Sequence, residues 1–153
     1  MNNSLEIKQI LYNKCVDFIE DRLKIINQSI LEIQESLSTE TKSSAGDKHE
    51  TGRAMLQLER EKAGNQLAEI LKIKKMLSKI NTDKTSKSIG LGSVVYTTQA
   101  NYYISISAGE LKFESDSFYA ISSNTPIGRL LMGETVGNSV KFREESFTIQ
   151  TVL

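Results

Sequence analysis

The sequence predicts an α+β protein, in which a long antiparallel helical hairpin, a coiled coil, is followed by a small β-rich domain with one short helix. Apolar residues follow a heptad spacing through much of residues 1–83, which favours helices that pair along one face. Short β-prone runs separated by turn residues fill residues 84–153. The single proline of the chain lies in this second part, so no proline interrupts the predicted helices. We therefore expect two domains, residues 1–83 and residues 84–153.

The composition disfavours several classes of protein. The chain of 153 residues carries 19 basic and 19 acidic side chains, with 13 of each in residues 1–83 and 6 of each in residues 84–153. Neither part is a polycation, which disfavours general binding to nucleic-acid backbones. The single cysteine, Cys15, excludes an intramolecular disulfide, and no apolar run approaches the roughly 20 residues of a membrane span. Because the N-terminus also lacks the pattern of a signal peptide, we expect a cytoplasmic protein with no membrane partner.

The first arm of the predicted hairpin covers residues 4 to about 38 and contains neither proline nor glycine. Its apolar residues are spaced alternately three and four positions apart, which is the seam of a coiled coil. An arm of this length spans roughly 50 Å, so it must pair with another helix or with another protein. We expect a monomer, although Tyr12 and Val16 on the seam could also serve a dimer. The predicted seam consists of Val16, Ile19, Leu23, Ile26, Ile30, Ile33 and Leu37.

A polar segment, residues 38–46, separates the two arms. Its hydroxyl side chains compete for backbone hydrogen bonds and it ends in glycine, so the first helix should stop there. A second helical pattern follows and extends to about residue 81. Residues 59–62 are charged where the seam would continue, which predicts looser packing near the tip of the hairpin. The predicted second seam consists of Leu56, Ala63, Leu67, Ile70, Ile73, Leu77 and Ile80.

The tip of the hairpin, residues 44–51, places two carboxylates, Asp47 and Glu50, three positions apart. One interpretation is structural, because an acidic pair with this spacing at a helix start forms a capping box and interacts favourably with the helix dipole. The other is functional: both carboxylates point outward and help hold a hard divalent cation such as Mg²⁺. Proteins usually bind Mg²⁺ through one or two carboxylates together with groups from a partner. Another macromolecule would therefore supply the remaining ligands.

Nucleophilic catalysis within the chain has no support in the sequence. The only histidine, His49, lies 34 residues from Cys15, which corresponds to roughly 50 Å along a straight helix. That distance excludes a Cys–His pair. A Ser-His-Asp triad has no supporting motif either, because the histidine lies at the predicted tip.

Beyond a polar linker at residues 81–88, the sequence changes to β-prone runs. Thr125 as N-cap and Pro126 at the first helical position predict a short helix over residues 126–132. Glycine and polar residues at positions 108–110 predict a turn. About five strands are expected, at residues 93–98, 102–107, 117–121, 140–142 and 146–152.

Several stretches are similar to segments of a known family. Residues 46–51, Gly-Asp-Lys-His-Glu-Thr, are similar to the motif Gly-Asp-x-x-Glu-Asn. Residues 121–133, Ile-Ser-Ser-Asn-Thr-Pro-Ile-Gly-Arg-Leu-Leu-Met-Gly, are similar to Ile-Ser-x-x-Ser-Pro-Ile-(Ala/Gly)-x-x-Leu-(Leu/Met)-Gly. Shorter matches lie at residues 92–95 and 137–140. With these segments in this order, the chain resembles the Gre transcript-cleavage factors of bacterial RNA polymerase.

The resemblance implies how the protein would act. The second domain would have an FKBP-like fold and dock at the rim of the polymerase secondary channel, and the hairpin would enter the channel. Asp47 and Glu50 would help hold the second catalytic Mg²⁺ and its water, which promotes hydrolysis of backtracked RNA near its 3′ end. Because the polymerase supplies the other ligands, the protein alone is expected to be inert. The docking residues that the resemblance implies are Ser122, Thr125, Pro126, Ile127 and Gly128.

Departures from the family pattern keep two alternatives open. Thr51 stands where the family has Asn, and the N-terminus lacks the family's Pro-x-Thr-x-x-Gly opening. One alternative is a regulator that binds the polymerase without stimulating cleavage. The other is an unrelated coiled-coil adaptor or chaperone.

Overall fold

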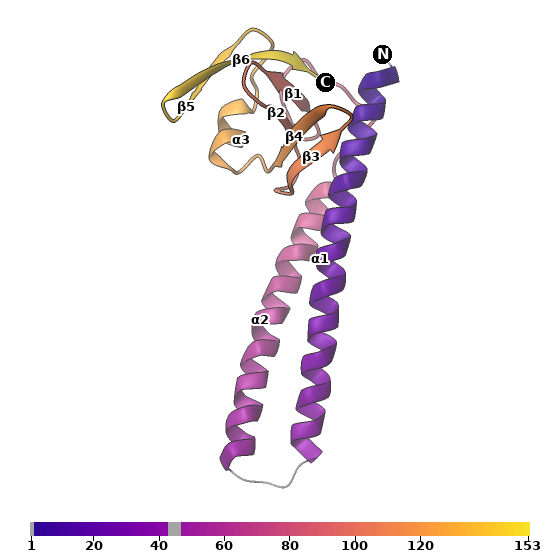
Figure 1. The fold of residues 1–153 in the computed structure, drawn as a ribbon, viewed down its shortest axis with the longest axis vertical. Coiled ribbons are helices and arrows are strands. Elements are labelled where there is room, and N and C mark those ends of the chain that lie inside the picture. Colours follow the sequence, from indigo (N-terminus) through magenta and orange to yellow (C-terminus); the bar gives the residue numbers. More distant parts are fainter. Residues whose placement is uncertain (1, 43–46) are drawn as a thin grey trace. The chain divides into compact units, whose positions relative to one another are not determined.

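A computed structural model describes the backbone of residues 2–42 and 47–153, and the side chains of residues 3–39 and 50–153. Two long helices come first in these residues, followed by six strands and a short third helix between the fourth and fifth strands (Figure 1). The predicted α+β fold class is confirmed. The elements are α1 (Asn2–Lys42), α2 (Asp47–Ser78), β1 (Val94–Thr97), β2 (Asn101–Ile104), β3 (Gly109–Phe113), β4 (Asp116–Ile121), α3 (Pro126–Leu131), β5 (Ser139–Phe142) and β6 (Glu145–Val152).

The chain divides into two compact units, and α1 and α2 contribute to both of them. One unit, called here the helical unit, is Ile19–Lys74. The other, called the sheet unit, joins Met1–Phe18 to Lys75–Leu153. The division therefore falls within the helices, whereas the predicted domain boundary lies in the linker that follows α2.

The helical unit is a pair of antiparallel helices that meet along the predicted seams (Figure 1). Its buried apolar side chains all belong to these seams, and the remaining seam residues are half-buried. On one side of the pair, Lys74 Nζ lies 2.7 Å from Glu20 Oε1. Heptad spacing thus identified which face of each helix packs. The buried set, among the described residues of this unit, is Ile19, Ile26, Ile30, Ala63 and Ile70.

Helix α1 extends further into the polar segment than the sequence predicted. It ends at Lys42, although its hydroxyl-rich residues begin at Ser38. The reason is visible at Thr39, whose Oγ1 donates a hydrogen bond to the carbonyl oxygen of Glu35 at 3.0 Å. The hydrogen bond of this hydroxyl thus forms within the helix, to the preceding turn, and not in a competing turn conformation. Residues 43–46, where the turn was expected to end in glycine, lie outside the described residues.

The sheet unit holds a mixed sheet with the strand order β3-β4-β2-β1-β6-β5. All neighbouring strands pair antiparallel except β2 and β4, which are parallel, with Tyr103 opposite Ala120. Strand β3 was missed, because residues 108–110 were predicted as a turn. It lies at the edge of the sheet, and Leu111 is its one buried side chain. An edge strand with charged residues carries little apolar signal, which explains why the pattern did not reveal it.

Both faces of this sheet are covered. Successive side chains on a strand point to opposite faces, and the neighbours Tyr103 and Ile104 are both fully buried. Ile104 belongs to the cluster that Leu131 of α3 joins. Tyr103 lies on the opposite face, close to Tyr12 and Cys15 of α1. The full cluster on the α3 side is Ile89, Val95, Ile104, Leu131, Val140, Phe147 and Ile149.

The first turns of α1 belong to the sheet unit through a stripe of buried side chains that the heptad analysis did not include. Ile7, Leu11 and Cys15 are spaced four apart and are all buried. Cys15 Sγ lies 3.5 Å from Ser105 Oγ, which follows β2. The face of α1 that packs in this unit is therefore not a simple continuation of the seam through Tyr12. None of the helices in the described residues is both long and apolar enough to span a membrane.

Candidate functional site

The tip carboxylates lie in the first turn of α2. Asp47 is the first residue of that helix, and Glu50 follows three residues later with an exposed side chain. An acidic side chain at this position interacts favourably with the positive end of the helix dipole. The side chain of Asp47 lies outside the described residues, as does that of His49. Both interpretations of the acidic pair, the capping box and the cation ligand, therefore remain predictions.

The chemistry that the tip can supply follows from its donor atoms. Carboxylate oxygens are the ligands that Mg²⁺ prefers, and one or two of them suffice when a partner completes the shell. Among the residues whose side chains the structure describes, no group of three or more His, Cys, Asp or Glu residues is arranged to hold a metal ion. A tight metal site contained in the described part of the chain is therefore not observed, and the predicted shared Mg²⁺ stays a prediction.

The predicted docking segment is organised around the start of α3. Thr125 is the N-cap: its Oγ1 accepts a hydrogen bond from the backbone N–H of Gly128 at 3.1 Å and donates one to the carbonyl oxygen of Ser122 at 2.7 Å. Pro126 follows at the first helical position, as predicted. The Ser122 hydroxyl oxygen accepts a bond from the backbone N–H of Asn124 at 3.2 Å. These contacts fix the direction in which α3 leaves the sheet.

Gly128 is required by close packing. A Cβ atom at this position would lie 2.3 Å from the carbonyl oxygen of Ser122 and 2.8 Å from Oγ1 of Thr125. Gly128 is buried, and the half-buried Ile127 packs against the core cluster. Much of the motif over residues 121–133 therefore has a structural explanation. Whether Ser122, Thr125, Pro126, Ile127 and Gly128 also contact a partner remains a prediction.

The surface beside this segment carries exposed apolar residues that the sequence analysis did not single out. Leu130 is 41% exposed, Met132 is 39% exposed and Val136 is 57% exposed. Spacing gave no signal for Leu130, because it lies three residues after Ile127, which packs against the core cluster, yet it is exposed. The docking surface, if it lies here, thus includes side chains outside the predicted set.

Cys15 lies in a buried cluster with Tyr103 and Ser105. Burial raises the pKa of the Cys15 thiol, and the hydrogen bond with Ser105 only partly opposes this effect. Burial also raises the pKa of Tyr103 well above its ordinary value, and its hydroxyl has no hydrogen-bond partner among the described residues. The thiol therefore stays protonated near neutral pH, whereas a nucleophile needs the thiolate. Cys15 is a structural residue of the sheet unit.

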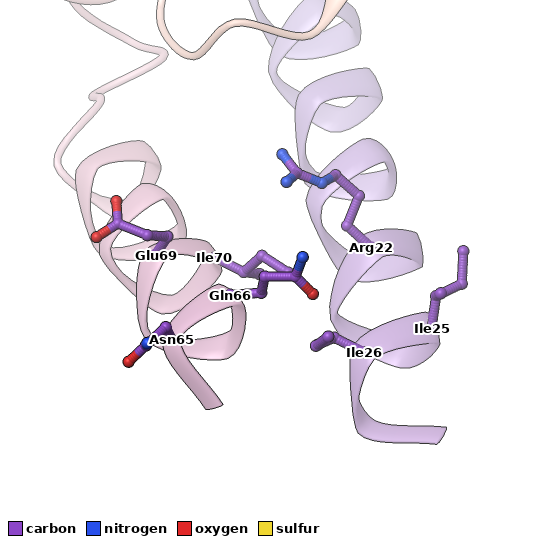
Figure 2. Close-up of a pocket in the computed structure, with 7 residues that line it drawn as sticks. All are labelled: Arg22, Ile25, Ile26, Asn65, Gln66, Glu69 and Ile70. Atoms are coloured by element: carbon purple, nitrogen blue, oxygen red, sulfur yellow. The ribbon is translucent and has the colours of Figure 1, made fainter. Parts of the chain in front are cut away.

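A shallow groove of about 410 Å³ lies between the arms of the helical unit. Figure 2 shows Gln66 extending from α2 toward α1, whereas Ile25 points away from α2. Arg22 and Glu69 contribute one charge of each sign to the lining. Amide and charged side chains of α2 line the groove together with the seam residues Ile26 and Ile70, and the lining offers no arrangement of a nucleophile with a base.

Comparisons with known proteins identify no family for this chain. No protein-family model and no curated protein matches the sequence. One similar solved structure is that of "the transcription factor Gfh1", which is 20% identical over 92% of this chain and 92% of that chain, with a TM-score of 0.35. A TM-score of this size carries no inference about activity or partners.

Proposed function

We propose that the protein is a transcription factor that binds bacterial RNA polymerase through the secondary channel and promotes hydrolysis of backtracked RNA. Two supports are independent of each other. The sequence motifs at residues 46–51 and 121–133 resemble those of the Gre transcript-cleavage factors. The helices α1 and α2 form an antiparallel pair, and residues 47–51 of the first motif form the first turn of α2, at the end where the two helices are joined.

The observation that carries the proposal is the position of the acidic pair. Helix α2 begins at Asp47, so Asp47 and Glu50 lie within one turn at the end of the hairpin where the two helices are joined. Glu50 is exposed to solvent. Carboxylates at such an end can reach a metal centre that belongs to another molecule, whereas carboxylates along the seam cannot.

In the proposed mechanism this chain contributes carboxylate oxygen ligands and holds them in position. Mg²⁺, bound jointly with the polymerase, would stabilise the attacking and leaving oxygens of the phosphodiester. Asp47 and Glu50 would orient that shared centre from one turn of helix, which is a rigid base for two side chains. The segment around Thr125 would set the position of α3 and of the exposed Leu130 and Met132 against the rim of the channel.

A cleavage assay on a stalled, backtracked elongation complex tests the proposal. The wild-type protein should shorten the RNA from its 3′ end, and Asp47→Asn and Glu50→Gln should each reduce the rate at least tenfold, because each removes a charged ligand without changing size. Glu59→Gln is the matched control, since Glu59 is an exposed carboxylate further along α2. An unchanged rate in both tip variants, or no cleavage by the wild type, contradicts the catalytic part.

A second candidate function is a regulator that occupies the channel without assisting hydrolysis. It is favoured by Thr51, which stands where the resembling family has Asn directly after the glutamate. Such a regulator would compete with other ligands of the channel and would not respond to Glu50→Gln. Copurification with RNA polymerase, combined with an absence of cleavage, separates this candidate from the first one. Failure to bind polymerase at all would leave a coiled-coil adaptor.

A further inference from the structure

We propose that a cavity in the sheet unit, bounded by α1 and the linker between α2 and β1, binds the phosphate group of a small anionic ligand. The cavity has a volume of about 370 Å³, which is within the range of small-molecule sites. Its wall combines three separate segments of the chain, the first turns of α1, the residues that follow α2, and the linker. The polar lining residues on which the inference depends are Lys8, Lys79, Lys84, Thr85, Ser86 and Ser93. The proposed polymerase function does not involve this cavity.

Lys8 is the central residue of the site. Its side chain carries an ammonium group, yet the residue is only 3% exposed. Nζ donates one hydrogen bond, to the carbonyl oxygen of Lys84 at 2.7 Å. An ammonium group has three donors, and among the described residues no carboxylate forms an ion pair with this one. Burial lowers the pKa of Lys8 with no opposing effect from a neighbouring acid.

A buried charge without a counterion is unfavourable, because the charged group loses its hydration and only a partner of opposite charge offsets that loss. A core position with no further purpose would be occupied more stably by a methionine or a leucine. The cavity beside Lys8 is the place from which an anion would supply the missing charge. An anion bound in this cavity would therefore offset the desolvation of the Lys8 ammonium group.

The rest of the lining reinforces the positive charge. Lys79 and Lys84 also line the cavity, so three lysine residues border it, while none of the described lining residues carries a carboxylate. The chain as a whole is neutral, so this concentration of one sign is local. Ser93, which is 3% exposed, accepts a hydrogen bond at its Oγ from the backbone N–H of Gly90 at 2.9 Å. Its own hydroxyl proton therefore remains available to an anion.

Phosphate fits this lining better than a carboxylate does. A phosphate monoester carries about −1.5 to −2 charges at pH 7 and three acceptor oxygens, which matches several separate ammonium groups. Lysine binds phosphate as a point charge, whereas planar carboxylates are recognised best by the forked guanidinium of arginine. The described lining includes neither arginine nor an aromatic ring on which a base could stack. The recognised part of the ligand is therefore the phosphate itself.

The test titrates pyrophosphate and inorganic phosphate into the full chain at constant ionic strength, with calorimetry and thermal unfolding as readouts. Saturable binding and a rise in melting temperature are expected. Lys79→Met combined with Lys84→Met should weaken binding at least tenfold. The matched control, Lys75→Met combined with Lys112→Met, removes two exposed lysines outside the cavity and should leave binding unchanged. Lys8→Met should abolish binding while the protein stays folded, as checked by circular dichroism.

Four outcomes would overturn the proposal. The first is the absence of saturable binding at millimolar phosphate and pyrophosphate. The second is equal weakening by the control pair, which would mean general charge attraction. The third is an equal response to succinate, a dicarboxylate, which would remove the preference for phosphate. The fourth is binding of a short single-stranded oligonucleotide without binding of pyrophosphate, which would assign the surface to a nucleic acid. Because no polymerase is present, none of these results depends on the proposed role in transcription.

Discussion

The helical unit and the sheet unit bury their apolar residues in different ways. Among described residues, the helical unit buries four isoleucines and one alanine, which form a single seam. The sheet unit buries aromatic rings as well, including Tyr103, Phe118 and Phe147. A pair of helices has one apolar interface, whereas a sheet covered on both faces has two. We therefore expect that the sheet unit contributes most of the stability of the chain.

This difference bears on where function can be placed. The candidate tip residues lie at the start of α2, where the flanking residues on the seam are the half-buried Leu56 and the charged residues 59–62. Their position depends on the local helix and not on a core around them. The lysine cavity, in contrast, is built from segments that only the folded sheet unit brings together. Substitutions at the tip should thus leave the free energy of unfolding nearly constant, whereas substitutions of buried residues in the sheet unit should lower it.

The largest expected effect is that of a core truncation in the sheet unit. Phe118 is fully buried and contacts Tyr96 edge to face, with ring centroids 5.5 Å apart. Phe118→Ala should lower the free energy of unfolding by about 3–5 kcal/mol, the usual cost of removing a buried ring. Ile26→Ala in the helical seam should cost only about 2 kcal/mol, at the low end for this change, because Ile26 is 7% exposed and lines an open groove. Urea unfolding followed by circular dichroism measures both.

If Ile26→Ala lowers the free energy of unfolding as much as Phe118→Ala does, the expectation that the sheet unit contributes most of the stability is wrong. Tyr119→Ala is the surface control for the phenylalanine, because Tyr119 is the next residue along β4 and is 42% exposed. Its substitution should change the free energy of unfolding by less than the core truncation does.

The second prediction tests whether the first turns of α1 belong to the sheet unit. Cys15 has no exposed surface, and burial raises the pKa of its thiol. Labelling by a thiol reagent at pH 8 should therefore be more than about 100-fold slower in the native protein than in urea, since it requires local or global opening. Labelling at the rate of the unfolded chain would show that this part of α1 does not stay packed on the sheet.

The raised pKa of the Cys15 thiol also predicts how stability depends on pH. The folded chain holds the Cys15 proton to a higher pH than the unfolded chain, whose thiol has the ordinary pKa of 9.0. The unfolded state thus loses the Cys15 proton first, and the contribution of this thiol to stability should fall as the pH rises past about 9. Cys15→Ala should reduce this slope between pH 9 and pH 10, below the range in which the raised pKa of Tyr103 acts in the same direction.

The third prediction concerns the close contact at the start of α3. Gly128→Ala places a methyl group against the backbone oxygen of Ser122 and should cost about 1–3 kcal/mol of stability through overpacking. Gly90→Ala is the matched control, because nothing lies within 4 Å of a Cβ atom there. Its effect should stay within about 0.5 kcal/mol. Thermal unfolding distinguishes the two, and equal values would mean that the contact at Gly128 relaxes without cost.

Short-range sequence patterns were sufficient to predict several elements of the fold. The heptad spacing identified the packed faces of both helices, and Thr125 followed by Pro126 identified the start of α3, because these signals act over a few residues. Strand β3 was missed because an edge strand needs only one buried side chain, Leu111. The end of α1 was placed imprecisely because a hydroxyl-rich segment can also remain helical, as at Thr39, whose hydroxyl bonds to the Glu35 carbonyl oxygen one turn earlier.

Long-range contacts mark the limit of what the sequence could predict. The contact between Cys15 and Ser105 joins residues 90 positions apart, so the second packed face of α1 has no local signature. Lys8 and Lys84 are brought together in the same way, by a hydrogen bond across 76 positions. In the sequence each of these lysines resembles an ordinary surface residue. The acidic pair at the tip could be proposed from the sequence because Asp47 and Glu50 are only three positions apart, and its role stays a prediction.

The smallest expected effect belongs to the ion pair in the helical unit. Lys74 Nζ lies 2.7 Å from Glu20 Oε1, and the two side chains are 47% and 46% exposed. A double-mutant cycle with Glu20→Gln and Lys74→Met should give a coupling energy of about 0.2–1 kcal/mol, because solvent screens an exposed pair. Raising the salt concentration from 0.05 to about 1 M should remove most of this coupling. A coupling energy well above that range would mean that this pair is a principal link between the two arms, and the single apolar seam would no longer be the main reason that they stay together.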